Sequence, residues 1–212
     1  MNREYLLDSL DGLKALVFRL LPPHIAGAIG CVPMTTDGPW TKEEKQIFQT
    51  AIGIPGKRTY WNPGAFANVP PSSNKGARAR WVDAVSAIDQ PYLFLDPDTG
   101  FYSHYLSRSE KMLLIDELGV MLRRRKALVV YRHRYWPKSI PTAAPLNAYK
   151  YVWHSLCMLR VAGFAAFAYQ SQAASFFFVA NQESGIRPFE AGLRQVLYGV
   201  SADVINRRLV FM

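Results

Sequence analysis

The chain has 212 residues and a formal net charge of +9, from 25 Lys and Arg against 16 Asp and Glu. Half of its residues are apolar, which excludes wholesale disorder and indicates one globular domain over residues 1–212. No apolar run reaches the roughly 18 residues that a membrane helix needs. Acidic residues near the N-terminus also argue against a secretion signal, so we expect a cytoplasmic protein that contacts no membrane.

Apolar spacing and capping signals predict the elements of the first half of the chain. Apolar residues at spacings of three and four predict the first helix, which Pro22 and Pro23 end. Thr41 begins a Thr-x-x-Glu capping box, and Gly53 is a suitable end for the helix that follows. In chain order we expect a helix over 5–21, a buried strand over 26–34, a helix over 42–52, a loop over 54–76 and a helix over 78–88.

The second half continues the alternation of strands and helices. A capping box at Ser107 opens a helix that runs to basic residues near Lys126, where the helix dipole favours cations. The other expected elements are strands over 92–95 and 127–131, a helix over 145–160, a strand pair over 164–169 and 175–179, a helix over 188–198 and a last strand over 209–211. Such alternation predicts an α/β fold, with a mostly parallel sheet, helices on both faces and a C-terminal antiparallel hairpin at the edge.

The two cysteines, Cys31 and Cys157, are far apart in the sequence and both have apolar neighbours. The four histidines are scattered singly, so no zinc-ligand spacing is present. We therefore expect two buried free thiols.

The positive charge is concentrated in a segment that lacks acidic residues. No Asp or Glu occurs between Leu118 and Gln182, and aromatic residues alternate with the basic ones there. A second basic cluster comprises Lys75, Arg78 and Arg80. Basic side chains beside exposed aromatic ones suit a polyanion with bases that stack, so we expect nucleic acid or a nucleotide as the partner. The alternative is a solvated basic surface with no ligand.

Polar side chains follow two of the predicted strands directly. One strand ends in Asp96-Pro97-Asp98-Thr99-Gly100, and the other ends in Tyr131-Arg132-His133-Arg134. Ligands in open α/β sheets bind beyond the carboxyl ends of the strands, so we expect the two clusters to share a site. The same Asp-Pro-Asp-Thr-Gly sequence would also make a stable turn.

Each of these residue types has a chemical role that suits such a site. Asp96 and Asp98 are candidate catalytic residues and ligands for Mg²⁺ or Mn²⁺, because a divalent cation relieves the repulsion between adjacent carboxylates. His133 is a candidate acid or base. The candidate substrate-binding residues are Thr99, Tyr131, Arg132, Arg134, Asp37 and Trp40, with the two arginines suited to phosphate.

A few other polar residues lie near these clusters. Asp37 and Trp40 follow the predicted strand 26–34, so they would join the same cleft. Asp11 and Lys14 lie on the first helix, and Glu117 lies on the helix before residue 127. A turn or surface role is the simpler interpretation of all five.

The order of elements from Tyr92 to Val179 resembles the carboxyl half of Rossmann-like class I methyltransferases. In the amino-methylating members, a strand ends in an acid or amide, two prolines and an aromatic residue, and Asp96-Pro97 matches the first two positions. The resemblance implies that Asp96 and the Pro97 carbonyl hold a target amine and that S-adenosylmethionine is the cofactor. The chain departs from the pattern at Asp98 and Thr99, and strand 26–34 is not followed by a glycine-rich turn.

Three functions therefore remain open. The first is metal-dependent hydrolysis of a phosphodiester or phosphoryl group at Asp96 and Asp98, which the acid pair favours. The second is a methyltransferase-like enzyme that modifies a base with S-adenosylmethionine. The third is a non-catalytic Rossmann-like module that binds nucleic acid.

Overall fold

The sheet of this protein is mixed. The structure is a computed structural model, and it describes residues 9–34, 40–61, 75–97, 113–133, 144–171, 174–196 and 209–211. Within these ranges six strands form one sheet in the order β1-β2-β3-β5-β4-β6. The strands are β1 (Ile29–Pro33), β2 (Tyr92–Asp96), β3 (Ala127–His133), β4 (Ala165–Gln170), β5 (Ala174–Ala180) and β6 (Leu209–Phe211).

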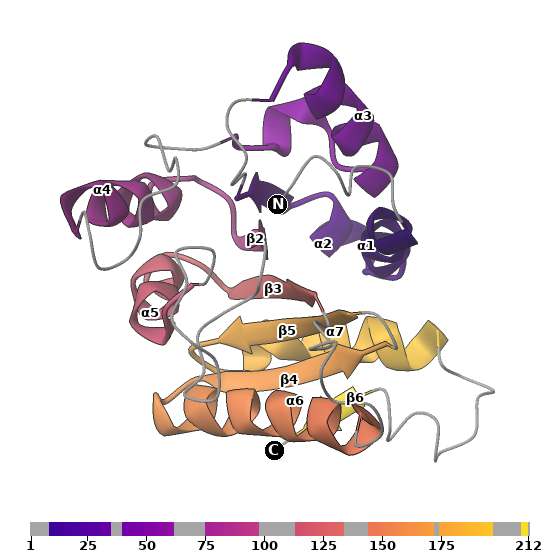
Figure 1. Cartoon of the computed structure of the whole chain (residues 1–212), viewed down its shortest axis with the longest axis vertical. Helices are drawn as coiled ribbons and strands as arrows, with labels where there is room; N and C mark the ends of the chain where they lie inside the picture. The colour runs from indigo at the N-terminus through magenta and orange to yellow at the C-terminus, as the bar shows by residue number, and fades with distance from the viewer. Residues whose placement is uncertain are drawn as a thin grey trace.

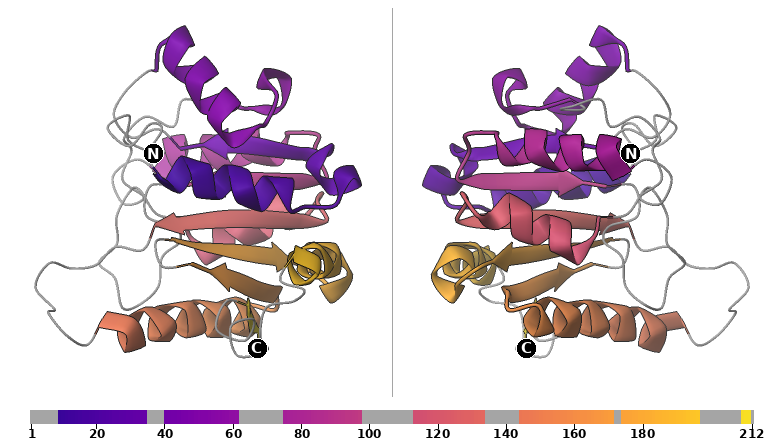
Figure 2. Two further views of the ribbon diagram at one scale, coloured as in Figure 1. Left: turned by 90° about the vertical axis from the view of Figure 1, so that its right-hand side faces the viewer. Right: turned by 90° about the vertical axis from the view of Figure 1, so that its left-hand side faces the viewer.

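Helices lie on both faces of the sheet (Figures 1 and 2). The helices are α1 (Ser9–Arg19), α2 (Pro23–Ala26), α3 (Lys42–Ile52), the 3-10 turn η2 (Gly56–Arg58), α4 (Lys75–Ser86), α5 (Ile115–Leu122), α6 (Ala144–Val161) and α7 (Glu183–Val196). The side chains of Phe94 and Tyr131 face α1, α2 and α7, and we call this side the α1 face. Those of Leu95 and Val130 face α4, α5 and α6, on the side we call the α6 face.

The parallel part of the sheet is limited to β1, β2 and β3. β5 is antiparallel to both of its neighbours, β3 and β4, and β6 is antiparallel to β4. The predicted α/β fold with helices on both faces is confirmed. The predicted C-terminal antiparallel hairpin is confirmed as β4–β5. The prediction of a mostly parallel sheet is wrong, because β5 turns back and inserts antiparallel beside β3, and β6 is the outer strand.

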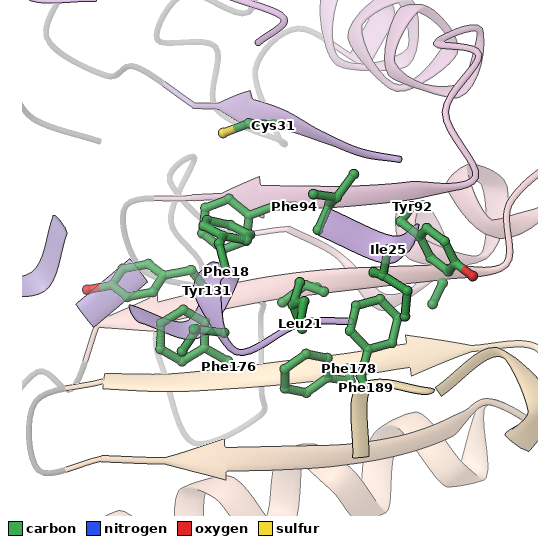
Figure 3. Packing of buried hydrophobic residues seen from close by; sticks show 14 of the residues in the cluster. Phe18, Leu21, Ile25, Cys31, Tyr92, Phe94, Tyr131, Phe176, Phe178 and Phe189 are labelled. Carbon is green, nitrogen blue, oxygen red and sulfur yellow. The ribbon is translucent and has the colours of Figure 1, made fainter. Parts of the chain in front are cut away.

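The apolar character of β5 explains its central position. All seven of its residues are buried, with Phe176 and Phe178 on the α1 face and Phe177 on the α6 face. The rings of Phe94, Tyr131 and Phe176 form a continuous layer beneath Phe18 of α1 (Figure 3). A strand that is apolar on both sides is stable only where helices cover both faces of the sheet. β4 is only partly buried and lies further out.

Local sequence signals account for several of the boundaries. The Thr41 hydroxyl accepts a hydrogen bond from the Glu44 N–H, and the Glu44 carboxylate accepts one from the Thr41 N–H, so the predicted capping box is formed. Gly53 then ends α3 with φ at 74°, a conformation that favours glycine. The strand pair β4–β5 and the strand β6 also form as predicted.

Several predicted boundaries differ from the structure: the strand expected over 26–34 is β1 at Ile29–Pro33, and the helix expected over 78–88 is α4 at Lys75–Ser86. Pro22 and Pro23 end the first helix, but Pro23 also begins the short helix α2, since proline is favoured at a first helical position. α7 begins at Glu183 rather than at residue 188. α5 begins at Ile115, and the predicted capping box at Ser107 lies outside the described residues.

Candidate functional site

Asp96 is the last residue of β2 and lies at the carboxyl edge of the parallel strands. It pairs with Pro33 of β1, and its carbonyl accepts a hydrogen bond from the Met34 N–H at 3.1 Å. Side chains alternate along a strand, so the Asp96 carboxylate lies on the α1 face with Phe94. It is 1% exposed, so a polar partner is required to offset the cost of burying it.

Lys14 of α1 is that partner. Its Nζ lies 2.9 Å from Asp96 Oδ2 and 3.1 Å from Oδ1 of Asp11, which is one helical turn earlier. Nζ also lies 4.4 Å from the centre of the Tyr131 ring and 5.9 Å from that of Phe48. One buried ammonium therefore bridges two carboxylates and is packed against aromatic rings.

The charges of this cluster support each other. Burial alone would lower the pKa of Lys14, but the carboxylates of Asp96 and Asp11 outweigh it and the pKa is raised. Burial raises the pKa of Asp96, and the neighbouring Lys14 ammonium opposes that shift. Lys14 is accordingly a cation at neutral pH, with Asp96 as its closest counter-charge.

The described part of this cluster does not fit a divalent metal. Lys14 already occupies the space between the two carboxylates. Among the residues that the structure describes, no group of three His, Cys, Asp or Glu side chains is placed to hold a metal ion. Asp98, the second predicted metal ligand, lies outside the described residues.

The described part of β1 likewise offers no cradle for S-adenosylmethionine. A Cβ on Gly30 would lie 2.9 Å from Leu93 Cδ2 and 3.0 Å from the Tyr60 ring, so this glycine allows close packing within the protein. The turn after the strand, residues 35–39, lies outside the described residues.

Two predicted substrate-binding residues lie on the α1 face. Tyr131 contacts Lys14 as described above. Trp40 is buried against Phe48 and Trp61, with ring centres 6.2 and 5.5 Å apart, and it forms part of the core. Four predicted site residues lie outside the described ranges, namely Asp37, Asp98, Thr99 and Arg134. His133 ends β3, but its side chain is also outside the described part of the structure.

Arg132 lies at the same edge of the sheet but on the α6 face. It is 9% exposed, and its Nη1 donates a hydrogen bond to Ser155 Oγ at 3.2 Å. Its guanidinium carbon lies 5.5 Å from the centre of the Tyr151 ring. The fold therefore places Asp96 and Arg132 at the ends of adjacent strands but on opposite faces of the sheet.

The basic segment is divided between the two ends of the sheet. Arg123, Arg124 and Lys126 precede β3, so they lie at the amino edge, away from Asp96. Arg125 is buried, and it donates hydrogen bonds to the carbonyls of Met121, Val85 and Ile88. Burial lowers the pKa of Arg125 to about 10. Its role is thus to connect α5 to α4.

Sequence reasoning placed Asp11, Lys14 and Glu117 at the surface, and all three are buried. The Glu117 carboxylate receives hydrogen bonds from Nε and Nη2 of Arg78 at 2.5 and 2.6 Å, on the α6 face. A signal for Lys14 was present, because it stands one turn before Val17 and Phe18 on the buried side of the helix.

Cys31 of β1 is expected to be chemically inert in the folded protein. It is fully buried, and burial raises the pKa of its thiol well above that of an exposed cysteine. A thiol reagent should leave Cys31 unmodified in the native wild type and in Cys157→Ser, and should modify it after unfolding in guanidinium. Rapid labelling of native Cys157→Ser would contradict this.

The fold and the Lys14–Asp96 cluster together define an α/β protein with a buried charged group at the carboxyl edge of its parallel strands. When the chain was compared with models of protein families, with curated proteins and with solved structures, no match was found. None of the described helices combines the length and apolar character needed to cross a membrane.

Proposed function

We propose that this protein is an enzyme that modifies a nitrogen atom of a nucleic-acid base or nucleotide, with the reacting amine held at Asp96. The observation that carries this proposal is the Asp96 carboxylate, which already holds one nitrogen group, the Lys14 ammonium, against the ring of Tyr131. A carboxylate that accepts N–H bonds beside an aromatic ring has the chemistry needed to orient an amino group.

The second oxygen of Asp96 would take the substrate amine. Lys14 uses Oδ2, and Oδ1 accepts no hydrogen bond from the described residues. A substrate amine could therefore donate to Oδ1 while Lys14 keeps the carboxylate ionised. An ionised carboxylate only accepts hydrogen bonds, so it would turn the N–H bonds of the amine toward itself and leave the nitrogen lone pair free for reaction.

The resemblance to amino-methylating enzymes supports methyl transfer as the reaction. That resemblance rests on an order of elements: a strand ending in Asp96-Pro97, a helix, a strand, a helix and an antiparallel strand pair. The chain contains them as β2, α5, β3, α6 and β4–β5. Metal-dependent hydrolysis is the weaker candidate, because Lys14 already lies between the carboxylates of Asp11 and Asp96 and pairs with both.

The test compares Asp96→Asn with Asp89→Asn, a matched change at an exposed aspartate. The assay measures transfer of a labelled methyl group from S-adenosylmethionine to DNA, RNA and nucleotides. We expect Asp96→Asn to lose activity by about a hundredfold or more, because the amine is no longer held in position, and Asp89→Asn to retain it. Circular dichroism and the melting temperature establish that each variant is folded.

Three outcomes would overturn the proposal. One is cleavage of nucleic acid that requires Mg²⁺ or Mn²⁺ and is lost in Asp96→Asn, which would indicate hydrolysis. Another is methyl transfer that survives unchanged in Asp96→Asn. The third is binding of nucleic acid, with no reaction, that Asp96→Asn leaves unchanged, which would indicate a binding module.

A further inference from the structure

No acid within the described ranges neutralises the buried guanidinium of Arg132. The other two buried cations at this end of the molecule each have one, since Lys14 pairs with Asp96 and Arg78 pairs with Glu117. Among the residues that the structure describes, the hydrogen-bond partner of Arg132 is the neutral hydroxyl of Ser155. Burial lowers the pKa of Arg132, and Tyr151 opposes that shift. A cation held this way makes the fold less stable than an apolar side chain would.

The described residues use little of the hydrogen-bonding capacity of Arg132. A guanidinium carries five N–H groups, and the contact with Ser155 uses one of them at Nη1. No residue in the described part of the chain accepts a hydrogen bond from Nε or Nη2 of Arg132, which is 9% exposed at the edge of the sheet. Two parallel N–H groups match the oxygens of a phosphate or carboxylate.

The surroundings hold the side chain of Arg132 in place. Ser155 of α6 is fully buried and fixes one arm of the guanidinium. The half-buried Tyr151, one turn earlier on α6, lies against the guanidinium plane at 5.5 Å. An arginine whose position is fixed by a hydroxyl and a ring loses little freedom on binding an anion.

We propose that Arg132, held in position by Ser155, binds the phosphate of a nucleotide or of a nucleic-acid strand. The inference that the ligand is a nucleotide rests on the proposed function, whereas the inference that it is an anion rests on Arg132 alone. Arg132 and Asp96 end adjacent strands on opposite faces, so one substrate would cross the edge of the sheet, with its amine at Asp96 and its phosphate at Arg132. Phosphate is preferred to carboxylate because it offers three or four oxygens, rather than two, to the N–H groups of Arg132.

The test is a calorimetric titration with inorganic phosphate, adenosine monophosphate and adenosine. The variants are Arg132→Gln and, as a matched control, Arg160→Gln at an exposed arginine toward the other end of α6. We expect Arg132→Gln to weaken binding of phosphate and of the nucleotide at least tenfold, which corresponds to about 1.4 kcal/mol. Arg160→Gln should change neither affinity, and adenosine should bind both variants and the wild type equally. Arg132→Lys, which keeps the charge but not the fork, should give an intermediate affinity.

Unfolding cannot mimic this result, because removal of an unneutralised cation is expected to leave the melting temperature unchanged or raised. Equal phosphate affinities of wild type and Arg132→Gln would overturn the proposal, as would equal losses in Arg132→Gln and Arg160→Gln. Failure of the proposed function gives a different result. Phosphate binding that depends on Arg132, together with no reaction that depends on Asp96, would refute the enzymatic proposal alone.

Discussion

Lys14→Met is expected to lower the free energy of unfolding by about 3–5 kcal/mol, the usual cost of removing one partner from a buried ion pair. The methionine would fill much the same volume, so the loss comes mainly from charge. Asp96 and Asp11 would face each other in the core without the ammonium that lies 2.9 and 3.1 Å from them. Equilibrium denaturation in urea measures the change.

The triple variant Asp11→Asn/Lys14→Met/Asp96→Asn is the control for this prediction. It should recover part of the lost stability, because no unpaired charge remains, although some amide groups stay unsatisfied. If Lys14→Met costs less than 1 kcal/mol, the ammonium cannot be holding the two carboxylates as the geometry indicates.

The same cluster predicts how stability depends on pH. The pKa of Lys14 is raised in the folded state above 10.5, the value for an exposed lysine. Its contribution is therefore complete below about pH 10.5 and is lost as the pH rises through the folded value. The stability difference between wild type and Lys14→Met should stay constant through neutral pH and shrink in alkali. At acid pH it should shrink as well, because Lys14 opposes the rise in the pKa of Asp96, so protonation of Asp96 stabilises folded Lys14→Met more than the folded wild type.

Arg78→Met is expected to cost about 3–5 kcal/mol for the same physical reason on the other face. Both nitrogen atoms of the Arg78 fork are used, and Glu117 also accepts a hydrogen bond from the Leu114 N–H at 2.7 Å, at the start of α5. Loss of Arg78 would leave this carboxylate buried and would loosen the contact between α4 and α5. Urea denaturation again gives the magnitude.

Arg78→Met/Glu117→Leu separates charge from packing at this position. The double variant should recover most of the stability, because an apolar pair of similar volume often replaces a buried ion pair without loss. It should still lack the hydrogen bond at Leu114, which is worth about 1 kcal/mol. Equal stabilities of Arg78→Met and wild type would show that the pair is solvated.

Signals confined to a few neighbouring residues predicted much of the fold. The capping box at Thr41, the apolar run that ends at Asp96 and the paired strands near residue 172 each predict an element that the structure contains. The position of β5 could not be predicted in this way. β5 is apolar on both faces, so it needs a position in the sheet where helices cover both sides. The place beside β3 meets that need, but it pairs residues about fifty positions apart in the sequence.

The candidate site could likewise be predicted only in part from the sequence. The positions of Asp96 and Arg132 at the carboxyl edge could be predicted, because the sequence indicates where each strand ends and in which direction it runs. The partner of Asp96 was missed because Lys14 belongs to a helix 82 positions away, and a lysine on an amphipathic helix usually reaches solvent. Such contacts depend on how the helix lies across the sheet.

The insertion of β5 between β3 and β4 also affects how the protein folds during translation. During translation, β1, β2 and β3 leave the ribosome long before residues 174–180, so β3 keeps one open edge while about forty further residues are added. An open strand edge is a template for pairing with other chains. The nascent protein therefore passes through a stage at which a chaperone that covers strand edges would raise its yield, and a stop codon before residue 174 would make that stage permanent.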